Sequence, residues 1–333
     1  GEPPALWARG ILEPLIFARE RSVLPAPISS TPSRLAHLSV NPSATRRRAS
    51  ASPRASSQFV LPADFPRDFE AVALLHSSDW SEVYRVRPLT SGGCDAPYAM
   101  KLPATGRDPV VASNMLRREI QAMRSVTHSN LVPLLDCRLE ERAWYLLTPY
   151  LEGATVRDVI DAGLRCPLGH ALWIARQMAQ ALAALHDAGW RHGDVKPENI
   201  LVSPSGHATL LDLGLAQPLE QLTTNLPHKL LAGSLTYLAP ECLQSGTPVG
   251  ASSDIYSLGV VLFQLLAGRP PFVAPNAASL IEAHRQVRPP ELPIGGCPTA
   301  RDVVQLVAQM LAKDPLRRPA SARQLARRLM RLE

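Results

Sequence analysis

The sequence predicts an α+β fold with two lobes: a small antiparallel β-sheet with one helix, followed by a larger, mainly helical lobe. Three observations support this prediction. Short runs of alternating apolar and polar residues, typical of half-buried strands, dominate residues 67–150. Amphipathic patterns with helical spacing dominate residues 151–333. The 333 residues, of which 46% are hydrophobic, suffice for a large core divided over two lobes.

Residues 1–66 are predicted to form a disordered tail. They are rich in Pro, Ser and Arg, and the stretch "SVNPSATRRRASASPRASS" has no sustained apolar period. Residues 1–60 contain eight Arg, three Glu and no Lys, so most of the net charge of +6 lies there. An Arg- and Ser-rich leader also fits a transit peptide, which stays open as an alternative.

The rest of the chain is close to neutral, with 27 basic and 26 acidic residues. This balance indicates no specific binding to nucleic acid. The longest apolar run, "IYSLGVVLFQLLAG", falls short of the ~18 to 20 residues that a transmembrane segment needs, so it predicts a buried helix. Five cysteines without paired spacing indicate free thiols in a reducing compartment, and we therefore expect a cytoplasmic protein.

The first lobe is expected to contain five strands and one helix. The helix carries apolar Val111, Met115, Met123 and Val126 among charged residues such as those of "RREIQ". The strand-like runs are residues 71–77, 81–88, 96–103, 131–139 and 142–153.

The second lobe is expected to be built from long helices. The run "HALWIARQMAQALAALHDAG" is amphipathic and ends in glycine, a common helix terminator. The seam between the lobes falls near residues 149–153, and ligands favour such seams. The predicted helices cover residues 170–189, 253–268, 300–314 and 321–333.

The strongest chemical signal is "HGDVKPENILVSPSGHATLLDLGLA". Within it, Asp194 is followed by Lys196 and Asn199 at +2 and +5, and Asp212 comes 13 residues after Asn199. Phosphoryl transfer needs these residue types: a carboxylate to orient the attacking hydroxyl, a cation for the moving phosphoryl group, and oxygen ligands for Mg²⁺.

These motifs resemble those of the eukaryotic-type serine/threonine protein kinase family. Its catalytic loop has the pattern His-Arg-Asp-x-Lys-x-x-Asn, and its metal loop has Asp-Phe-Gly. Here the catalytic loop is residues 192–199, "HGDVKPEN", and the metal loop is residues 212–214, "DLG". The ordered pair is far more specific than a lone short motif. The resemblance covers about residues 69–330 and implies a two-lobed protein-kinase-like fold.

The resemblance implies a role for each residue of the two loops. Asp194 would be the base that orients the substrate hydroxyl, and Lys196 would steady the γ-phosphate of ATP. Asn199 and Asp212 would hold Mg²⁺.

A lysine and a glutamate of the first lobe complete this set. Lys101 in "YAMK" matches the family's phosphate-anchoring lysine, and Glu119 in "RREIQ" matches its helix partner. The chain has only four lysines beside 31 arginines, so two lysines at family positions, Lys101 and Lys196, add support.

The resemblance also places the adenine of ATP at the seam. Thr148 would be the gatekeeper, with the Pro149 carbonyl and the Leu151 backbone as hydrogen-bond partners. Proline at 149 keeps its carbonyl, so that interaction is retained. Ala99 and Leu201 would lie on the two faces of the base.

The stretch "LLHSSDWSEVYRV" departs from the family's phosphate loop. The family has Gly-x-Gly-x-x-Gly, and glycine lets backbone N–H groups approach phosphate. We still expect the loop to cover ATP, but less closely. An ordinary hairpin that does not touch the nucleotide is the alternative. The residues expected to contact the nucleotide here are Leu75, His76, Ser78, Ser81 and Val83.

A second departure is Gly193, where many family members have an arginine that grips a phosphate on the activation segment. We therefore expect little activation by phosphorylation of Thr223 or Thr224. Three further matches are architectural in the family: Glu241 in "APE" pairs with Arg318 in "KDPLRRP", and Asp254 in "SDIYSLG" supports the catalytic loop.

Together these residues predict a protein kinase that transfers the γ-phosphoryl group of ATP to serine or threonine hydroxyls of protein substrates, with Mg²⁺. Two rivals remain at this stage. One is a pseudokinase, a nucleotide-responsive scaffold, which the missing glycines favour. The other is a small-molecule phosphotransferase of related fold, against which "GSLTYLAPE" and the Asp254 helix count. The sequence leaves the substrate, the regulatory input and the oligomeric state open.

Overall fold

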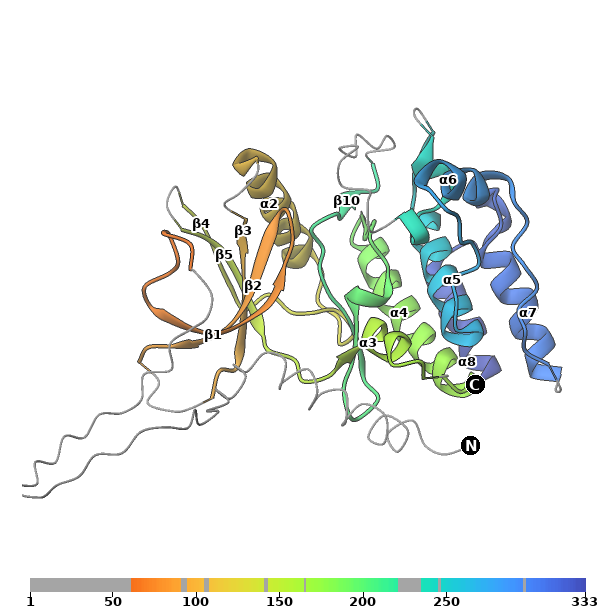
Figure 1. The fold of residues 1–333 in the computed structure, drawn as a ribbon, viewed down its shortest axis with the longest axis horizontal. Helices are drawn as coiled ribbons and strands as arrows, with labels where there is room; N and C mark the ends of the chain where they lie inside the picture. The colour runs from red at the N-terminus through yellow and green to blue at the C-terminus, as the bar shows by residue number, and fades with distance from the viewer. Residues whose placement is uncertain are drawn as a thin grey trace, which may run out of the picture.

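The computed structural model describes residues 61–90, 95–104, 108–140, 143–164, 166–220, 235–244, 247–295 and 298–333. A β-sheet with one helix forms one lobe, and a larger helical lobe follows it (Figure 1). The predicted fold class is therefore confirmed. The predicted tail lies outside the described residues, except for residues 61–66.

The sheet of the first lobe is antiparallel throughout, with strand order β1-β2-β3-β5-β4. Tyr84, Val86 and Met100 form its core on one face and are almost fully buried. The alternation of these residues with partly exposed ones is what the sequence pattern predicts for a sheet with one covered face. Its strands are β1 (Phe69–Ser77), β2 (Ser81–Pro88), β3 (Tyr98–Pro103), β4 (Asp136–Glu140) and β5 (Ala143–Pro149).

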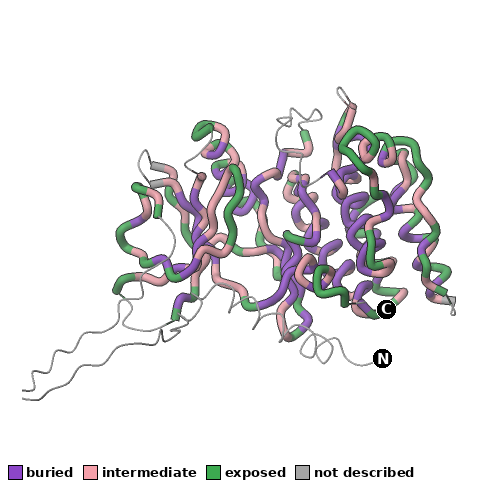
Figure 2. The backbone as a smooth tube through the Cα atoms, viewed as in Figure 1, coloured by how far each residue is buried: buried purple, intermediate pink, exposed green. Residues whose placement is uncertain are grey.

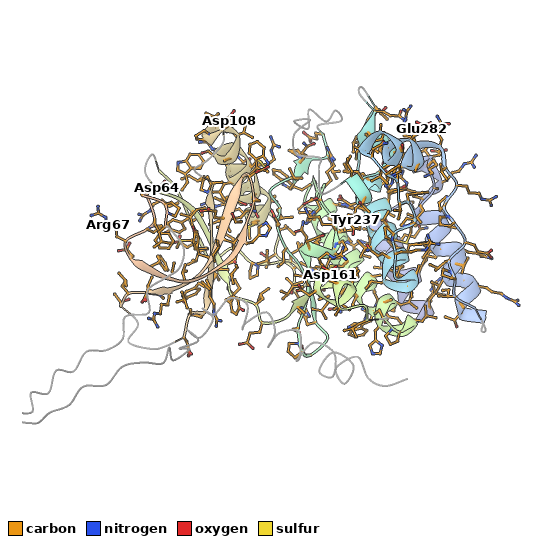
Figure 3. The ribbon with its side chains drawn as sticks, in the orientation of Figure 1. Asp64, Arg67, Asp108, Asp161, Tyr237 and Glu282 are labelled. Carbon is orange, nitrogen blue, oxygen red and sulfur yellow. The ribbon has the colours of Figure 1, made fainter. Side chains whose placement is uncertain are left out.

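Helix α2 (Pro109–Ser125) packs against β3 and β5. Asp108, at its start (Figure 3), accepts hydrogen bonds from two N–H groups of the first turn. Its buried face contains Leu116, Ile120 and Met123. This face is rotated from the predicted one, since Met123 is the only fully buried member of the predicted apolar set.

Residues 131–135 are not a strand, contrary to the prediction. Pro133 lacks a backbone N–H, so it cannot take part in a regular ladder. The neighbouring N–H of Val132 donates to the Leu210 carbonyl of the helical lobe (3.1 Å). The strand β4 therefore begins only after this segment.

Asn130 fastens the same segment to the helical lobe. Its side-chain amide donates to Gln177 Oε1 (3.0 Å) and to the Ala208 carbonyl (2.8 Å), and its own carbonyl accepts from the Leu210 N–H (2.8 Å). Asn130 and Gln177 are both buried, so these bonds form without competition from water.

The core of the helical lobe surrounds α5, whose residues from Ser253 to Leu265 are all buried. Buried residues predominate along α4 and α5 (Figure 2), as predicted for the apolar run in α5. No helix among the described residues is long and apolar enough to cross a membrane. The helices are α3 (Val156–Asp161), α4 (Leu168–Asp187), α5 (Ser252–Ala267), α6 (Ala277–Gln286), α7 (Pro298–Met310) and α8 (Ala322–Leu332).

Short strands hold the two motif loops beside one another. The catalytic loop runs from β7 into β8, and the metal loop runs from β9 into β10. Strand β8 pairs with β9, and β7 pairs with β10, so both loops emerge together at the seam. The strands are β6 (Ala154–Thr155), β7 (Trp190–Arg191), β8 (Ile200–Val202), β9 (Ala208–Leu210) and β10 (Gln217–Pro218).

Glu241 and Arg318 form a buried ion pair, as the resemblance implies. Arg318 Nη1 lies 2.6 Å from Glu241 Oε1, and its Nη2 lies 2.8 Å from Oε2. The side chain of Arg318 is 0% exposed and that of Glu241 is 3% exposed. The bidentate geometry connects the segment after residue 235 to the end of the chain.

Candidate active site

The catalytic loop presents three of the predicted residues in mutual contact. Asn199 Nδ2 donates to the Asp194 carbonyl (2.8 Å) and to Asp194 Oδ2 (3.0 Å). Lys196 Nζ lies 2.6 Å from the same Oδ2. A 3₁₀ turn, η1 (Pro197–Asn199), brings Asn199 back towards Asp194.

Asp254 of α5 is hydrogen-bonded to the backbone of this loop. Its carboxylate, 1% exposed, accepts the backbone N–H of His192 (2.8 Å) and of Gly193 (2.9 Å). His186 Nε2 lies 2.9 Å from it. Burial alone raises the pKa of Asp254, but the hydrogen bond and charge of His186 and the backbone donors hold this pKa below its ordinary value. Asp254 therefore stays ionised.

His192 and Gly193 explain the shape of the loop. His192 is fully buried, and its Nε2 lies 3.1 Å from the Leu211 carbonyl, next to the metal loop. Gly193 has a φ of 78°, a region that glycine enters without cost. A Cβ at this position would lie 2.8 Å from the Leu215 carbonyl oxygen.

Lys101 joins the two lobes at the metal loop. Its Nζ lies 2.8 Å from Glu119 Oε2 and 2.7 Å from Asp212 Oδ1. Asp212 has a φ of 58° and accepts the Gly214 N–H (2.9 Å), whereas Glu119 accepts the Leu213 N–H (3.1 Å). The expected Lys101–Glu119 pair is therefore present; its role towards phosphates stays a prediction.

The charges of this triad are strongly coupled. Burial alone lowers the pKa of Lys101, but the carboxylates of Asp212 and Glu119 hold it above its ordinary value. Burial raises the pKa of Asp212, yet the Lys101 ammonium and the Gly214 N–H hold it well below its usual range. Burial raises the pKa of Glu119 to about 7, although Lys101 opposes this change. Lys101 and Asp212 are therefore both charged at neutral pH.

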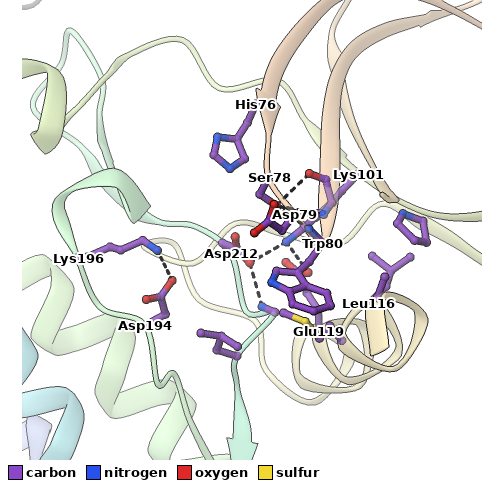
Figure 4. Close-up of a pocket in the computed structure, with 16 residues that line it drawn as sticks. His76, Ser78, Asp79, Trp80, Lys101, Leu116, Glu119, Asp194, Lys196 and Asp212 are labelled. Carbon is purple, nitrogen blue, oxygen red and sulfur yellow. Dashed lines mark hydrogen bonds and ion pairs between the residues drawn. The ribbon is translucent and has the colours of Figure 1, made fainter. Parts of the chain in front are cut away.

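These side chains face one cavity of about 230 Å³ between the lobes. Figure 4 shows Lys101, Glu119 and Asp212 meeting on one side of it, with the Lys196–Asp194 pair on the other. Trp80, at the tip of the β1–β2 hairpin, lines the same cavity. The cavity is smaller than the roughly 300 Å³ at the lower end of small-molecule sites, and the hairpin tip forms part of its lining.

The residues expected around adenine, together with Leu75 and Val83 of the first hairpin, form the adenine set, which is spread over five strands and the connection after β5. None of these residues lines the cavity, and Asn199, buried beside Asp194, does not line it either. Their contacts with a nucleotide therefore stay predictions. The adenine set is Leu75, Val83, Ala99, Thr148, Pro149, Leu151 and Leu201, on β1, β2, β3, β5, β8 and the connection after β5.

The sequence-based list missed lining residues on α2. Ala112, Met115 and Leu116 line the cavity on the same helix as Glu119. They lie three, four and seven positions before Glu119, and such positions share one face of a helix. Helical spacing counted back from Glu119 was therefore a signal that could have found them. Asp79 and Trp80 belong to the loop that was expected to cover ATP, but a hairpin tip has no such period that would single them out as lining residues.

The glycine-free loop is a closed hairpin tip. Strand pairing continues up to Ser77 and Glu82, and Ser78 organises what remains. Ser78 Oγ accepts the backbone N–H groups of Trp80 (3.3 Å) and Ser81 (3.1 Å). Serine hydroxyls commonly stabilise turns in this way. The hydroxyl thus engages two amides at the place where the family's loop presents N–H groups to phosphate.

This geometry predicts a gain in affinity when the glycines are restored. His76→Gly combined with Ser78→Gly should tighten ATP binding roughly three- to thirtyfold, because one or two charge-assisted hydrogen bonds are worth about 1 to 3 kcal/mol, less about 1 kcal/mol for the added loop mobility. The measurement is calorimetric titration with Mg²⁺ and ATP.

Two controls accompany this titration. Adenosine lacks phosphates, so an equal effect on adenosine would move the cause away from the phosphates. Ser77→Gly adds a glycine beside the tip without releasing an amide, so it should leave the affinity near that of the wild type. No effect of the double substitution on either ligand would favour the hairpin alternative.

The sequence was compared with protein families and with curated proteins. Residues 78–330 match the protein kinase domain family. The chain is 35% identical over 206 residues to the serine/threonine-protein kinase PrkC of Bacillus subtilis, covering 62% of this chain and 32% of that protein. It is 32% identical over 260 residues to the serine/threonine-protein kinase pkn2 of Myxococcus xanthus, covering 72% and 31%. Identity to the serine/threonine-protein kinase PknB of Mycobacterium leprae is 32% over 226 residues, covering 65% and 35%.

The matched region accounts for most of the chain and contains both motif loops. The chain belongs to the protein kinase family. It spans about a third of the length of the curated relatives that it matches.

Proposed function

We propose that the chain is an active serine/threonine protein kinase, with residues 67–150 as its N-lobe and residues 151–333 as its C-lobe. The reaction transfers the γ-phosphoryl group of ATP to a hydroxyl of a protein substrate. The observation that carries this proposal is the contact of Lys101 with both Glu119 and Asp212, on the same cavity as Asp194 and Lys196.

The roles follow from the positions. Asp194 orients the substrate hydroxyl and accepts its proton, while Lys196, 2.6 Å away, adds the positive charge that steadies the γ-phosphate. Lys101, held by Glu119, contacts the α- and β-phosphates. Positioning and electrostatic stabilisation supply most of the catalysis of phosphoryl transfer, so a pre-formed set of charges suits this reaction.

Asn199 and Asp212 fit a magnesium site. Among the described residues, no hydrogen bond involves Asp212 Oδ2 or Asn199 Oδ1, so both oxygens remain available. Mg²⁺ prefers such hard oxygen ligands together with phosphate oxygens. When bound, the ion would neutralise charge on the phosphates.

A serine/threonine specificity has two supports. Lys196 lies two residues after Asp194, the pattern of the serine/threonine branch, and the relatives above carry that name. The pseudokinase alternative is disfavoured because all six polar residues of the transfer machinery are present, and five of them lie within 3 Å of an oppositely charged partner.

The direct test is radiolabel transfer from ATP to a generic protein acceptor. Wild-type protein should label the acceptor, and Asp194→Ala, purified in the same way, should not. Equal labelling by both preparations would indicate a contaminating kinase. Labelling of a small metabolite in place of the protein acceptor would favour the small-molecule phosphotransferase.

Activation by phosphorylation of the segment is predicted to be weak. Thr223 and Thr224 lie outside the described residues, but Gly193 removes the usual phosphate receptor. Replacing both threonines with alanine should therefore leave the transfer rate within about threefold, under roughly 1 kcal/mol of activation energy. The check compares the variant with phosphatase-treated wild type. A much larger loss would reveal a switch that uses another cation.

A further inference from the structure

Arg191 is a buried cation on the strand that enters the catalytic loop. The residue is 2% exposed and lies on β7, immediately before His192. Its Nη2 donates to Gln217 Oε1. None of the ion pairs among the described residues includes Arg191, and within that part of the chain its Nε has no hydrogen-bond partner. Burying a guanidinium without a counter-charge costs several kcal/mol, so an apolar side chain would be the more stable choice.

Gln217 lies where the chain leaves the metal loop. It is the fifth residue after Asp212, on β10, directly opposite Arg191 in the β7–β10 pair. The pairing continues with the Leu219 N–H, which donates to the Gly189 carbonyl (2.8 Å). The Arg191–Gln217 bond therefore joins the strand entering the catalytic loop to the strand leaving the metal loop.

The same side chain also acts electrostatically beyond the activation segment. Burial and the Glu241 carboxylate raise the pKa of the Cys242 thiol to about 12, and the Arg191 charge opposes this change. Arg191 thus lies near the described residues on both sides of residues 221–234. Position 193 cannot supply a positive charge near this segment, because it is a glycine. A Cβ added there would lie 2.8 Å from the Leu215 carbonyl oxygen.

We propose that Arg191 is a positioning residue that holds the segment after the metal loop against the catalytic loop through Gln217, without any phosphate on that segment. This inference rests on the proposed kinase function. It states which contact positions the metal loop and the catalytic loop relative to each other. Many family members use an arginine at position 193 to bind a phosphate on the segment. Here Arg191 binds a neutral side-chain amide on β10, that of Gln217, and needs no phosphate.

The test compares Arg191→Met, Gln217→Leu and the double variant, all treated with phosphatase. Each single variant should lower kcat about tenfold while leaving the KM for ATP within about twofold, because Lys101 and Asp212 are held by other contacts. The double variant should be no slower than the singles, since one interaction is removed in all three. Arg87→Met removes an arginine of the exposed Glu70 pair and is the matched control.

Stability separates positioning from a merely architectural role. Arg191→Met removes a buried charge, so its Tm should equal or exceed that of the wild type while kcat falls. Gln217→Glu offers the guanidinium a carboxylate and should keep wild-type activity. The same substitution combined with Arg191→Met should be the slowest variant, because it buries an unpaired carboxylate.

Amide hydrogen exchange gives a readout independent of transfer. The Leu219 amide should exchange at least about tenfold faster in Arg191→Met than in the wild type if the strand pairing loosens. Absence of transfer by the wild type together with this faster exchange would contradict the kinase proposal alone. Unchanged kcat and unchanged exchange in both single variants, or a kcat that falls only with Tm, would overturn the role of Arg191.

Discussion

Asp194→Asn is expected to reduce phosphoryl transfer by roughly 10²-fold or more, the loss expected when a positioned base or orienting group is removed. Asparagine keeps the size of the side chain but loses the charge that pairs with Lys196 and the proton acceptor for the hydroxyl. The Lys101–Glu119–Asp212 contacts do not involve Asp194, so the affinity for ATP should stay near the wild-type value. Steady-state radiolabel assays and calorimetry measure the two quantities.

The matched control is Asp161→Asn. Asp161 is an exposed carboxylate at the end of α3, paired with Arg157 on the same helix, and it lies outside the cavity. Its replacement should leave transfer within about twofold, as is usual for exposed pairs. Wild-type rates in Asp194→Asn would show that the catalytic loop has been assigned to the wrong residues.

The second large effect concerns stability. Glu241→Ala should lower the free energy of unfolding by about 3 to 5 kcal/mol, because it leaves the fully buried Arg318 guanidinium without its carboxylate. The remaining bonds of Arg318, to the carbonyls of Ala312, Ser252 and Lys313, satisfy some donors but do not neutralise its charge. Urea unfolding followed by circular dichroism measures the change.

Glu70→Ala provides the comparison for this pair. Glu70 contacts Arg87 on the surface of the sheet, with side chains 49% and 28% exposed, so its loss should cost no more than about 1 kcal/mol. Adding Arg318→Met to Glu241→Ala should recover part of the lost stability, since no buried charge then remains. Equal losses at positions 70 and 241 would refute the buried-pair argument.

Local sequence signals predicted most of the fold and the centre of the site. Most strands and helices followed their apolar periods, apart from residues 131–135 and the buried face of α2, and the short spacings within the motifs pointed to Asp194, Lys196, Asn199 and Asp212, whose roles stay predictions. These signals succeed because each depends on residues close together in the chain.

The features that the sequence did not predict depend on contacts between distant segments. The Arg191–Gln217 bond needs β7 and β10 to pair across 26 residues. Residues 131–135 lost their predicted strand to hydrogen bonds with Leu210, nearly 80 positions later. The closed tip around Ser78 is local, but a serine hydroxyl can bond several backbone groups, and the sequence does not specify which ones.

The attachment of residues 130–132 to the helical lobe determines how the lobes can move. Because Asn130 is bound to Gln177 and Ala208, we expect α2 to pivot about its end near Ser125 when the lobes move, with its first turn moving furthest. At 1.5 Å per residue, the first turn lies about 24 Å from this pivot and Glu119 only about 9 Å. A rotation that opens the cleft therefore moves Glu119 little more than a third as far as it moves Asp108, which lets the contact with Lys101 survive motions that admit a nucleotide.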